Sequence, residues 1–191
     1  ACLHYSKKST DFATIVYSEK EKDRIIFVHK GASEDLNNHD YQPTDFNVKW
    51  IYLASLMGKS LQTGKEIVKY AEDIGVKVLF NPSLYLAQKG FKFLKPILSV
   101  TKILVLNKEE AQALLNTKQE SLIYLLHKLH SLGPETVIIT NGAKKMGAIN
   151  ANQLFFLIPP KVKVVQTAGA GDSFTAGFLA GVIKNYSFED A

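Results

Sequence analysis

Residues Val164–Ala180 read VVQTAGAGDSFTAGFLA, in which a β-branched run, a glycine-rich segment and an apolar run follow one another. The valines favour a strand over residues 162–165, and Phe174–Ile183 has the composition of a buried helix. Gly169 and Gly171 permit a tight turn whose amide groups are not screened by Cβ atoms. The first amides of a helix have no internal partner and carry partial positive charge. The order of residues therefore predicts an anion site, most often a phosphate site, at the start of this helix.

Asp172 stands at the predicted start of the helix and has two interpretations. As a first-turn acid it is stabilised by the helix dipole, which is a purely structural role. As a general base it would take the proton from an alcohol that attacks a bound phosphate, and it would then need this position. If the site only bound phosphate, a carboxylate there would bring no advantage, because its negative charge would repel that of the phosphate. From the glycine motif alone, capping and catalysis are about equally supported.

The run TAGAGDSFTAGF resembles the C-terminal signature of the ribokinase-like (PfkB-type) carbohydrate kinases, which reads Asp-Thr-x-Gly-Ala-Gly-Asp before a helix of small residues. The resemblance implies that Asp172 is the catalytic base. It also implies an anion hole for the transferred phosphoryl group, formed by Gly169, Ala170 and Gly171. Gln166 stands where the family usually has an aspartate that helps to hold a monovalent cation. We therefore expect potassium to matter less here than in typical relatives.

The composition of the 191 residues is that of an ordinary soluble globular protein, with 46% hydrophobic and 21% charged residues. The net charge of +5 is mild and the lysines are scattered among acids, so we expect no nucleic-acid partner. No apolar run approaches ~20 residues, and the first residues do not resemble a signal peptide, so we expect no membrane association. The single cysteine, Cys2, rules out an internal disulfide and is consistent with a cytoplasmic protein.

Short apolar strands alternate with helices from Trp50 onward, which predicts an α/β fold with a parallel sheet covered on both faces. Before this region, residues 12–31 read as a β-hairpin with a charged turn at 19–23. The predicted strands contain WIYLAS, VKVLFN, KILVLN, TVIIT, GAIN and LFFLIP, and the predicted helices are GKEIVKYAEDIG, Leu84–Leu98, Glu109–Leu115 and Glu120–Leu132.

The family resemblance implies a ribokinase-like three-layer α/β/α sandwich with a mostly parallel sheet and a small β lid. We predict the domain boundary between Asn37 and Pro43. Residues 1–40 would form the β-lid strands, and residues 41–191 a nucleotide-binding and phosphoryl-transfer α/β domain, incomplete at both ends. Intact members of the family begin with a Gly-Gly-rich segment that binds substrate hydroxyls and end with further helices, and neither portion is recognisable here.

Polar residues follow several of the predicted strands, namely Asn81, Asn107 and Thr140. In open α/β sheets, ligands bind outside the carboxyl ends of the strands, so we expect these side chains at the edge of a site. Asn107 and Glu110 also have the spacing of a helix capping box, which is a satisfactory structural interpretation by itself. The same residues match the Asn-x-x-Glu motif of the family, which implies that Glu110 organises Mg²⁺ through water. This is physically sensible because Mg²⁺ keeps most of its waters in proteins.

The segment IITNG resembles the nucleotide loop of the family, although Asn-Gly is also a common turn dipeptide. The resemblance implies nucleotide binding by Asn107, Thr140 and Gly142. Four residues, AKKM, separate Gly142 from the next glycine, so the loop is longer than usual. Lys144 or Lys145 would be able to reach a phosphate, but an exposed lysine usually has no specific role.

The segment RIIFVHKGASEDL resembles the lid strands of these kinases, whose end comes over the sugar. The resemblance implies that Gly31, at the end of the lid, and Asn81 contact the substrate. Ser33 replaces the asparagine that commonly follows Gly-Ala in the family. Tyr85 occupies roughly the place of an arginine that many members have after the position of Asn81.

Together these features predict an ATP-dependent kinase, a phosphotransferase that uses Mg²⁺ and transfers the γ-phosphoryl group to a hydroxyl of a sugar or nucleoside. The alternative is a non-catalytic nucleotide-binding fragment of such a kinase, which the missing acceptor segment and Gln166 favour. A homodimer formed through the lid is also expected from the resemblance. A Rossmann dehydrogenase is disfavoured, because no strand with a ribose-binding acid follows the glycine loop.

Overall fold

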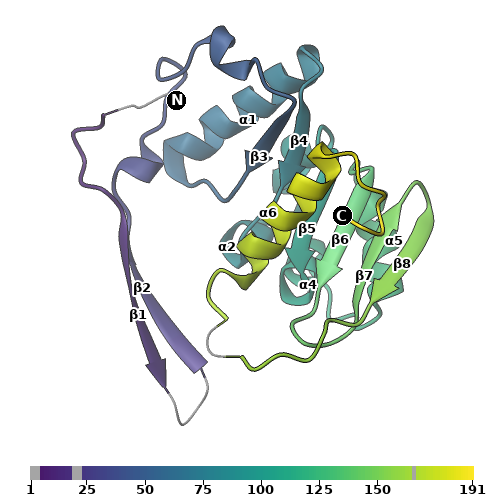
Figure 1. The fold of residues 1–191 in the computed structure, drawn as a ribbon. Coiled ribbons are helices and arrows are strands. Elements are labelled where there is room, and N and C mark those ends of the chain that lie inside the picture. The colour runs from purple at the N-terminus through teal and green to yellow at the C-terminus, as the bar shows by residue number, and fades with distance from the viewer. Residues whose placement is uncertain (1–4, 19–22, 165–166) are drawn as a thin grey trace. The chain divides into compact units, whose positions relative to one another are not determined.

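The structure is a computed structural model that describes residues 5–18, 23–164 and 167–191 (Figure 1). Its internal contacts divide the chain into two compact units. The N-terminal unit comprises Ala1–Asn47 and Leu56–Ile67, and the larger unit comprises Val48–Ser55 and Val68–Ala191. The predicted division into a lid of residues 1–40 and a domain of residues 41–191 stays a prediction.

The larger unit is built on one six-stranded sheet with the strand order β3-β4-β5-β6-β7-β8. The first four strands are parallel, and β7 and β8 are antiparallel to their neighbours, so the prediction of a mostly parallel sheet is confirmed. Its strands are β3 (Trp50–Leu53), β4 (Lys77–Phe80), β5 (Ile103–Asn107), β6 (Thr136–Thr140), β7 (Met146–Asn150) and β8 (Gln153–Leu157), and its helices are α2 (Leu84–Ala87), α3 (Gly90–Leu98), α4 (Lys108–Leu115), α5 (Leu122–His130) and α6 (Ala170–Ile183).

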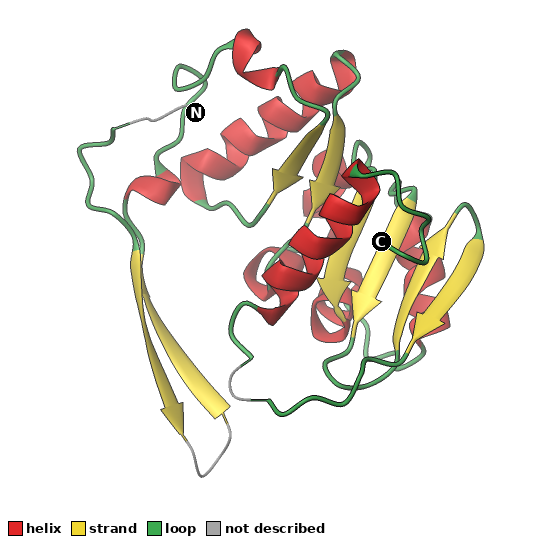
Figure 2. Cartoon of the chain, viewed as in Figure 1, coloured by secondary structure: helices red, strands yellow, loops and turns green. Residues whose placement is uncertain are grey.

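Helices cover both faces of this sheet, as the cartoon shows (Figure 2). On one face, Phe178 and Leu179 of α6 form a buried cluster with strand residues that include Leu79 and Val105. Successive side chains of a strand point to opposite faces, so Leu104 and the other alternate residues face the side where α4 and α5 pack. The sheet is therefore apolar on both faces, which explains the nearly uninterrupted hydrophobic strands in the sequence.

Two of the expected elements differ from the structure. The helix predicted over Leu84–Leu98 is divided into α2 and α3 by a turn at residues 88–89, and Gly90, the first residue of α3, adopts a positive φ of 79°. The strand predicted over residues 162–165 is absent from its described part: residues 161–164 are irregular, with Val162 71% exposed. The prediction was wrong because β propensity forms a strand only where a partner strand is available.

The N-terminal unit contains the predicted hairpin, made of β1 (Phe12–Ser18) and β2 (Asp23–His29), which pair antiparallel from Phe12↔His29 to Ser18↔Asp23. Two short 3₁₀ helices follow, Ala32–Glu34 and Pro43–Phe46. The helix α1 (Gly58–Asp73) contributes its first turns to this unit and begins earlier than GKEIVKYAEDIG suggested. Ser60 and Thr63 explain the early start, since their buried hydroxyls bond the amide and the carbonyl of Leu36 at 2.9 and 2.8 Å.

None of the helices within the described residues combines the length and the apolar character that crossing a membrane requires.

Candidate active site

The start of α6 has the geometry of an anion site. Gly169 is the N-cap residue and adopts the left-handed conformation at φ 78°, which favours glycine. A Cβ atom added to Gly169 or Gly171 would meet nothing within 4 Å, so the space in front of both is open. The amide of Ala170 donates to the carbonyl of Thr167 at 3.2 Å, whereas the amides of Gly171 and Asp172 donate to no other described residue. These two amides and the helix dipole are therefore available to an anion.

Asp172 lies in the first turn of α6 with its residue exposed. Its carboxylate forms no hydrogen bond or ion pair with any of the described residues, which are 5–18, 23–164 and 167–191. Within the described part of the chain, Asp172 is therefore stabilised by the helix dipole alone.

Asn107 and Glu110 form a complete capping box at the start of α4. The Glu110 amide donates to Asn107 Oδ1 at 2.9 Å, and the Asn107 amide donates to Glu110 Oε2 at 2.8 Å. Burial raises the pKa of Glu110, the bond from the Asn107 amide lowers it, and the charges of Glu109 and Asp172 raise it further. The negative field of Asp172 therefore reaches Glu110, which brings α6 and α4 to one site.

The site suits a hard divalent cation that keeps most of its water. Glu110 is partly buried among other carboxylates, an arrangement that a bound cation would stabilise. Among the described residues, no three His, Cys, Asp or Glu side chains gather into a metal-binding group. A cation held here would thus depend on few protein ligands, as Mg²⁺ does in phosphate-binding sites.

Asn107 and Thr140 lie side by side, because they are register partners at the carboxyl ends of the parallel strands β5 and β6. Gly142 follows in a turn with φ 57°, in which the Lys144 amide donates to the Asn141 carbonyl at 3.0 Å. Lys145 lies over the ring of Phe156, with Nζ 4.3 Å from its centroid.

Lys144, the other lysine of this loop, lies within the electrostatic reach of Glu120. Its positive charge contributes to a lowered pKa of Glu120, whose main causes are hydrogen bonds from Lys108 and Gln112. The two loop lysines thus have interactions within the protein.

Asn81 connects three strands of the sheet. Its amide group donates to the carbonyl of Val105 at 2.8 Å, and its Oδ1 accepts a hydrogen bond from the hydroxyl of Tyr52 at 3.3 Å. Sequence reasoning missed Tyr52, because a tyrosine inside WIYL is what strand propensity alone would place there. Burial raises the pKa of Tyr52, and the charge of Asp172 raises it further, so the electrostatic field of Asp172 reaches this residue.

Gly31, the predicted substrate contact in the N-terminal unit, is held by Asp11. The Asp11 carboxylate accepts the amides of Gly31 and Ser33 at 2.9 and 3.0 Å, the Ser33 hydroxyl also donates to it, and Lys30 Nζ lies 3.6 Å away. A Cβ atom on Gly31 would lie 2.1 Å from the carbonyl oxygen of Ser9, so only glycine fits. Ser33 therefore fixes the end of the lid through Asp11.

We expect Ser33→Ala to raise the pKa of Asp11 from about 2 toward its ordinary value of 3.8, because the Ser33 hydroxyl is the largest cause of the lowered pKa. The charged carboxylate stabilises the folded unit above pH 3.8, and this contribution is lost as pH falls through about 2. Carbon NMR titration of the carboxyl group measures the change. Ser9→Ala is the matched control, because the Ser9 hydroxyl contacts His29 at 3.2 Å and not Asp11. An unchanged Asp11 pKa in Ser33→Ala would contradict the assignment.

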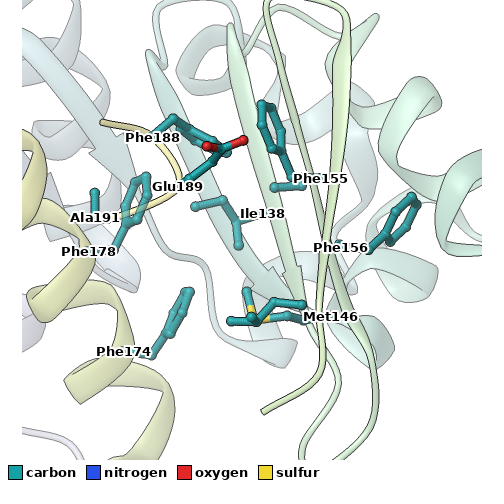
Figure 3. A pocket seen from close by; sticks show the side chains of 12 residues that line it. Ile138, Met146, Phe155, Phe156, Phe174, Phe178, Phe188, Glu189 and Ala191 are labelled. Carbon is teal, nitrogen blue, oxygen red and sulfur yellow. The ribbon is translucent and has the colours of Figure 1, made fainter. Parts of the chain in front are cut away.

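A separate apolar cavity of about 260 Å³ lies between the sheet and α6 (Figure 3). Its walls include Phe155 of β8, Phe174 and Phe178 of α6, and Phe188 in the segment that follows α6. None of the predicted site residues lines it. Gln166, on which the potassium expectation depends, lies outside the described residues.

An open helix start with an exposed carboxylate, and a second acidic residue after a parallel strand, are features that a site for phosphoryl transfer would need. The sequence model of the pfkB family of carbohydrate kinases matches residues 1–191, and the chain belongs to this family. The family predicted from the signature is thereby confirmed.

Two curated relatives show how the chain compares with other members. It is 27% identical to an uncharacterized sugar kinase of Archaeoglobus fulgidus, over 95% of this chain and 76% of the relative. It is 26% identical to a nucleoside kinase of Methanocaldococcus jannaschii, over 98% of this chain and 59% of that protein.

Solved structures show the fold. An adenosine kinase of Anopheles gambiae, in complex with P1,P4-di(adenosine-5) tetraphosphate, matches 97% of this chain with a TM-score of 0.85 and 21% identity. The ribokinase-like fold is thereby confirmed. The chain spans 60% of that kinase's length, so much of the relative has no counterpart here.

Proposed function

We propose that the natural protein containing this chain is an ATP-dependent kinase that transfers the γ-phosphoryl group to a hydroxyl of a sugar or nucleoside. One observation carries the proposal: an exposed carboxylate, Asp172, stands beside available amides at the start of α6, within the field of Glu110. This combination of a base with an anion site is what transfer from a phosphate to an alcohol requires.

Each residue at the start of α6 has its own role in this reaction. The amides of Gly171 and Asp172 donate to the oxygens of the transferred phosphoryl group, together with the dipole of α6. Gly169 and Ala170 shape this turn, and the open space in front of the glycines lets a phosphate approach the backbone. Asp172 takes the proton of the acceptor hydroxyl as its oxygen attacks the γ-phosphorus, and the bond to the leaving ADP oxygen breaks.

The edge formed by Asn107, Thr140 and Gly142 would hold the nucleotide. Glu110 would hold Mg²⁺ through water, and the ion, when bound, supplies charge neutralisation at the phosphate oxygens. Gly31 and Asn81 are proposed to contact the acceptor. Because Gln166 is neutral, we keep the expectation that potassium matters less here than in typical relatives.

The lid strands support a homodimer formed through the hairpin. In an antiparallel hairpin, residues that pair across the two strands lie on the same face. Both faces here carry exposed apolar side chains. Ile25 and Phe27, which are 62% and 60% exposed, lie on one face, and Ile15 and Val28, which are 44% and 53% exposed, lie on the other. A two-stranded sheet without a covered face is marginal in water. A second copy of the hairpin would cover one of these faces.

We expect the double variant Ile25→Ser, Phe27→Ser to shift the protein from dimer to monomer, because it removes two large apolar side chains from one face. Light scattering after gel filtration measures the mass. Ile158→Ser, which alters a residue that is 72% exposed outside the lid, should leave the mass unchanged. A wild-type protein that is monomeric at high concentration would end this part of the proposal.

The kinase proposal is tested by measuring ADP release from ATP and Mg²⁺ by the natural full-length protein, against a panel of sugars, phosphosugars and nucleosides. We expect release that depends on one class of acceptor. Calorimetry with a non-hydrolysable ATP analogue is run in parallel. Nucleotide binding without release for any acceptor would favour the non-catalytic nucleotide-binding protein instead. Absence of nucleotide binding would refute both.

A further inference from the structure

A second cavity, of about 370 Å³, lies at the amino ends of the parallel strands. It is lined by the first residues of β3, β4 and β5, which are Trp50, Lys77 and Ile103, and by Val182 near the end of α6. Because α6 runs antiparallel to these strands, its start and the carboxyl ends of the strands lie at the other edge of the sheet (Figure 1). Among the described residues that line the cavity, none is a predicted site residue. The cavity is therefore separate from the candidate active site.

The walls of this cavity are largely apolar. Ile103 and Phe178 are buried and form part of the core between the sheet and α6. Trp50 and Tyr186 add two aromatic rings, of which that of Tyr186 belongs to an exposed residue. The volume lies at the lower end of the range for small-molecule pockets, which suits a ligand with one or two rings. Aromatic walls favour a planar body that can stack on them.

Two lysines line the same cavity. Lys77 Nζ lies 5.5 Å from the centroid of the Trp50 ring, and no carboxylate of the described residues forms an ion pair with it. Lys102 forms an ion pair with Glu135. Both lysines belong to residues 74–108, a stretch that contains six lysines and no acidic residue. The charge of Lys77 is therefore available to a ligand, and that of Lys102 is shared with Glu135.

Asn150, the last residue of β7, adds a further hydrogen-bond donor. The buried hydroxyl of Thr136 donates to Asn150 Oδ1 at 3.0 Å, so the oxygen of this amide is already bonded within the sheet. Its NH₂ group forms no hydrogen bond with any other described residue, and it can donate to a ligand. No acidic residue is among the described residues that line the cavity. Two ammonium groups and an amide donor together favour a negatively charged ligand.

We propose that this cavity binds a small planar organic anion, with its rings against Trp50 and Phe178 and its acidic group between Lys77 and Lys102. The acidic group is a carboxylate or a phosphate ester, which share the charge and the acceptor oxygens that the lysines require. An inorganic anion would leave the aromatic walls uncovered, and a neutral ring would leave the lysines unpaired. The site does not depend on the proposed kinase function, because it uses none of the same residues.

Trp50 provides a local readout for the test, since it is the one tryptophan of the 191 residues. The natural full-length protein is labelled with fluorotryptophan, and a Trp50→Phe variant assigns the fluorine resonance of this ring. Three probes of matched shape are titrated: naphthoate, naphthyl phosphate and the neutral naphthylmethanol. We expect the two anions to shift the Trp50 resonance saturably. The neutral probe should bind about tenfold more weakly, the usual effect of losing one charged hydrogen-bonding partner.

Two variants should change the affinity in opposite directions. Lys77→Gln removes the available charge and should weaken naphthoate binding about tenfold, while leaving that of naphthylmethanol unchanged. Glu135→Gln releases Lys102 from its ion pair and should strengthen naphthoate binding about two- to fivefold, the range that an exposed ion pair contributes. Lys118→Gln is the matched control, since it removes one exposed positive charge outside the cavity and should alter neither affinity.

The outcomes decide the proposal without reference to catalysis. Tighter binding of naphthoate or of naphthyl phosphate identifies the acidic group, and either result supports the site. The absence of a saturable shift of the Trp50 resonance with both anions would overturn it, as would equal affinities for the charged and neutral probes. If Lys77→Gln fails to fold, the comparison of the probes and the Glu135→Gln variant still give the answer. A wild-type protein that releases no ADP would refute the kinase function and leave this site untouched.

Discussion

Asp172→Asn should reduce kcat of the natural full-length protein by about 10²–10⁴-fold, the usual effect of losing a general base. The amide has the size of the carboxylate but cannot accept the proton of the acceptor hydroxyl. The start of α6 should survive, because Gly169 and the backbone bonds of the turn are unchanged and the lost dipole interaction is worth only ~0.3–1 kcal/mol. ATP affinity should stay equal or rise slightly, since one negative charge beside the phosphates is removed.

The measurement combines steady-state kinetics, calorimetry with an ATP analogue and a melting curve. Asp73→Asn provides the control for the loss of one exposed acidic charge at a helix end remote in sequence. A correctly folded Asp172→Asn variant with near-normal kcat would return Asp172 to the role of a first-turn acid. The kinase mechanism proposed for this site would fall with that result.

Glu110→Gln should raise the Mg²⁺ concentration needed for half-maximal activity by about 10–100-fold, the usual cost of losing a group that orients the ligands of a metal. The glutamine oxygen can still accept the Asn107 amide, so the capping box is retained. Burial raises the pKa of Glu110 above its ordinary 4.5, so ionisation costs folding free energy as pH rises through the raised pKa. The amide removes that cost, and at pH 7 the melting temperature should be unchanged or higher.

Glu109→Gln is the control for this experiment, because it removes the same charge from the same first turn of α4 at an exposed residue. Its Mg²⁺ requirement should change little. Equal requirements in Glu110→Gln and the wild-type protein would leave Glu110 with its capping role alone.

The sequence was informative wherever a local rule and the tertiary structure agree. The capping box at Asn107 needs only residues three apart, and the hydrophobic strands need only burial on both faces. The glycine-rich start of α6 was found for the same reason, since its conformation is set by Gly169 itself. The family signature then supplied the order in which these parts occur.

The features that were missed depend on contacts between distant residues. Tyr52 looks like any strand tyrosine until its hydroxyl is seen to donate a hydrogen bond to Asn81, 29 residues away in the sequence. The early start of α1 depends on Leu36, whose amide donates to Ser60 Oγ and whose carbonyl accepts the Thr63 hydroxyl. The strand expected before the glycine turn failed because pairing, and not propensity, decides whether valines form a strand.

The capping box has a consequence for how such a protein would change over generations. Asn107 and Glu110 hold the start of α4 whether or not any reaction takes place, so selection for folding alone would retain both. Asp172 has no such bond among the described residues, so selection for folding would favour it only through its weak interaction with the helix dipole. A descendant that had lost its activity would therefore lose the aspartate long before the Asn-x-x-Glu motif. In this chain the aspartate is still present.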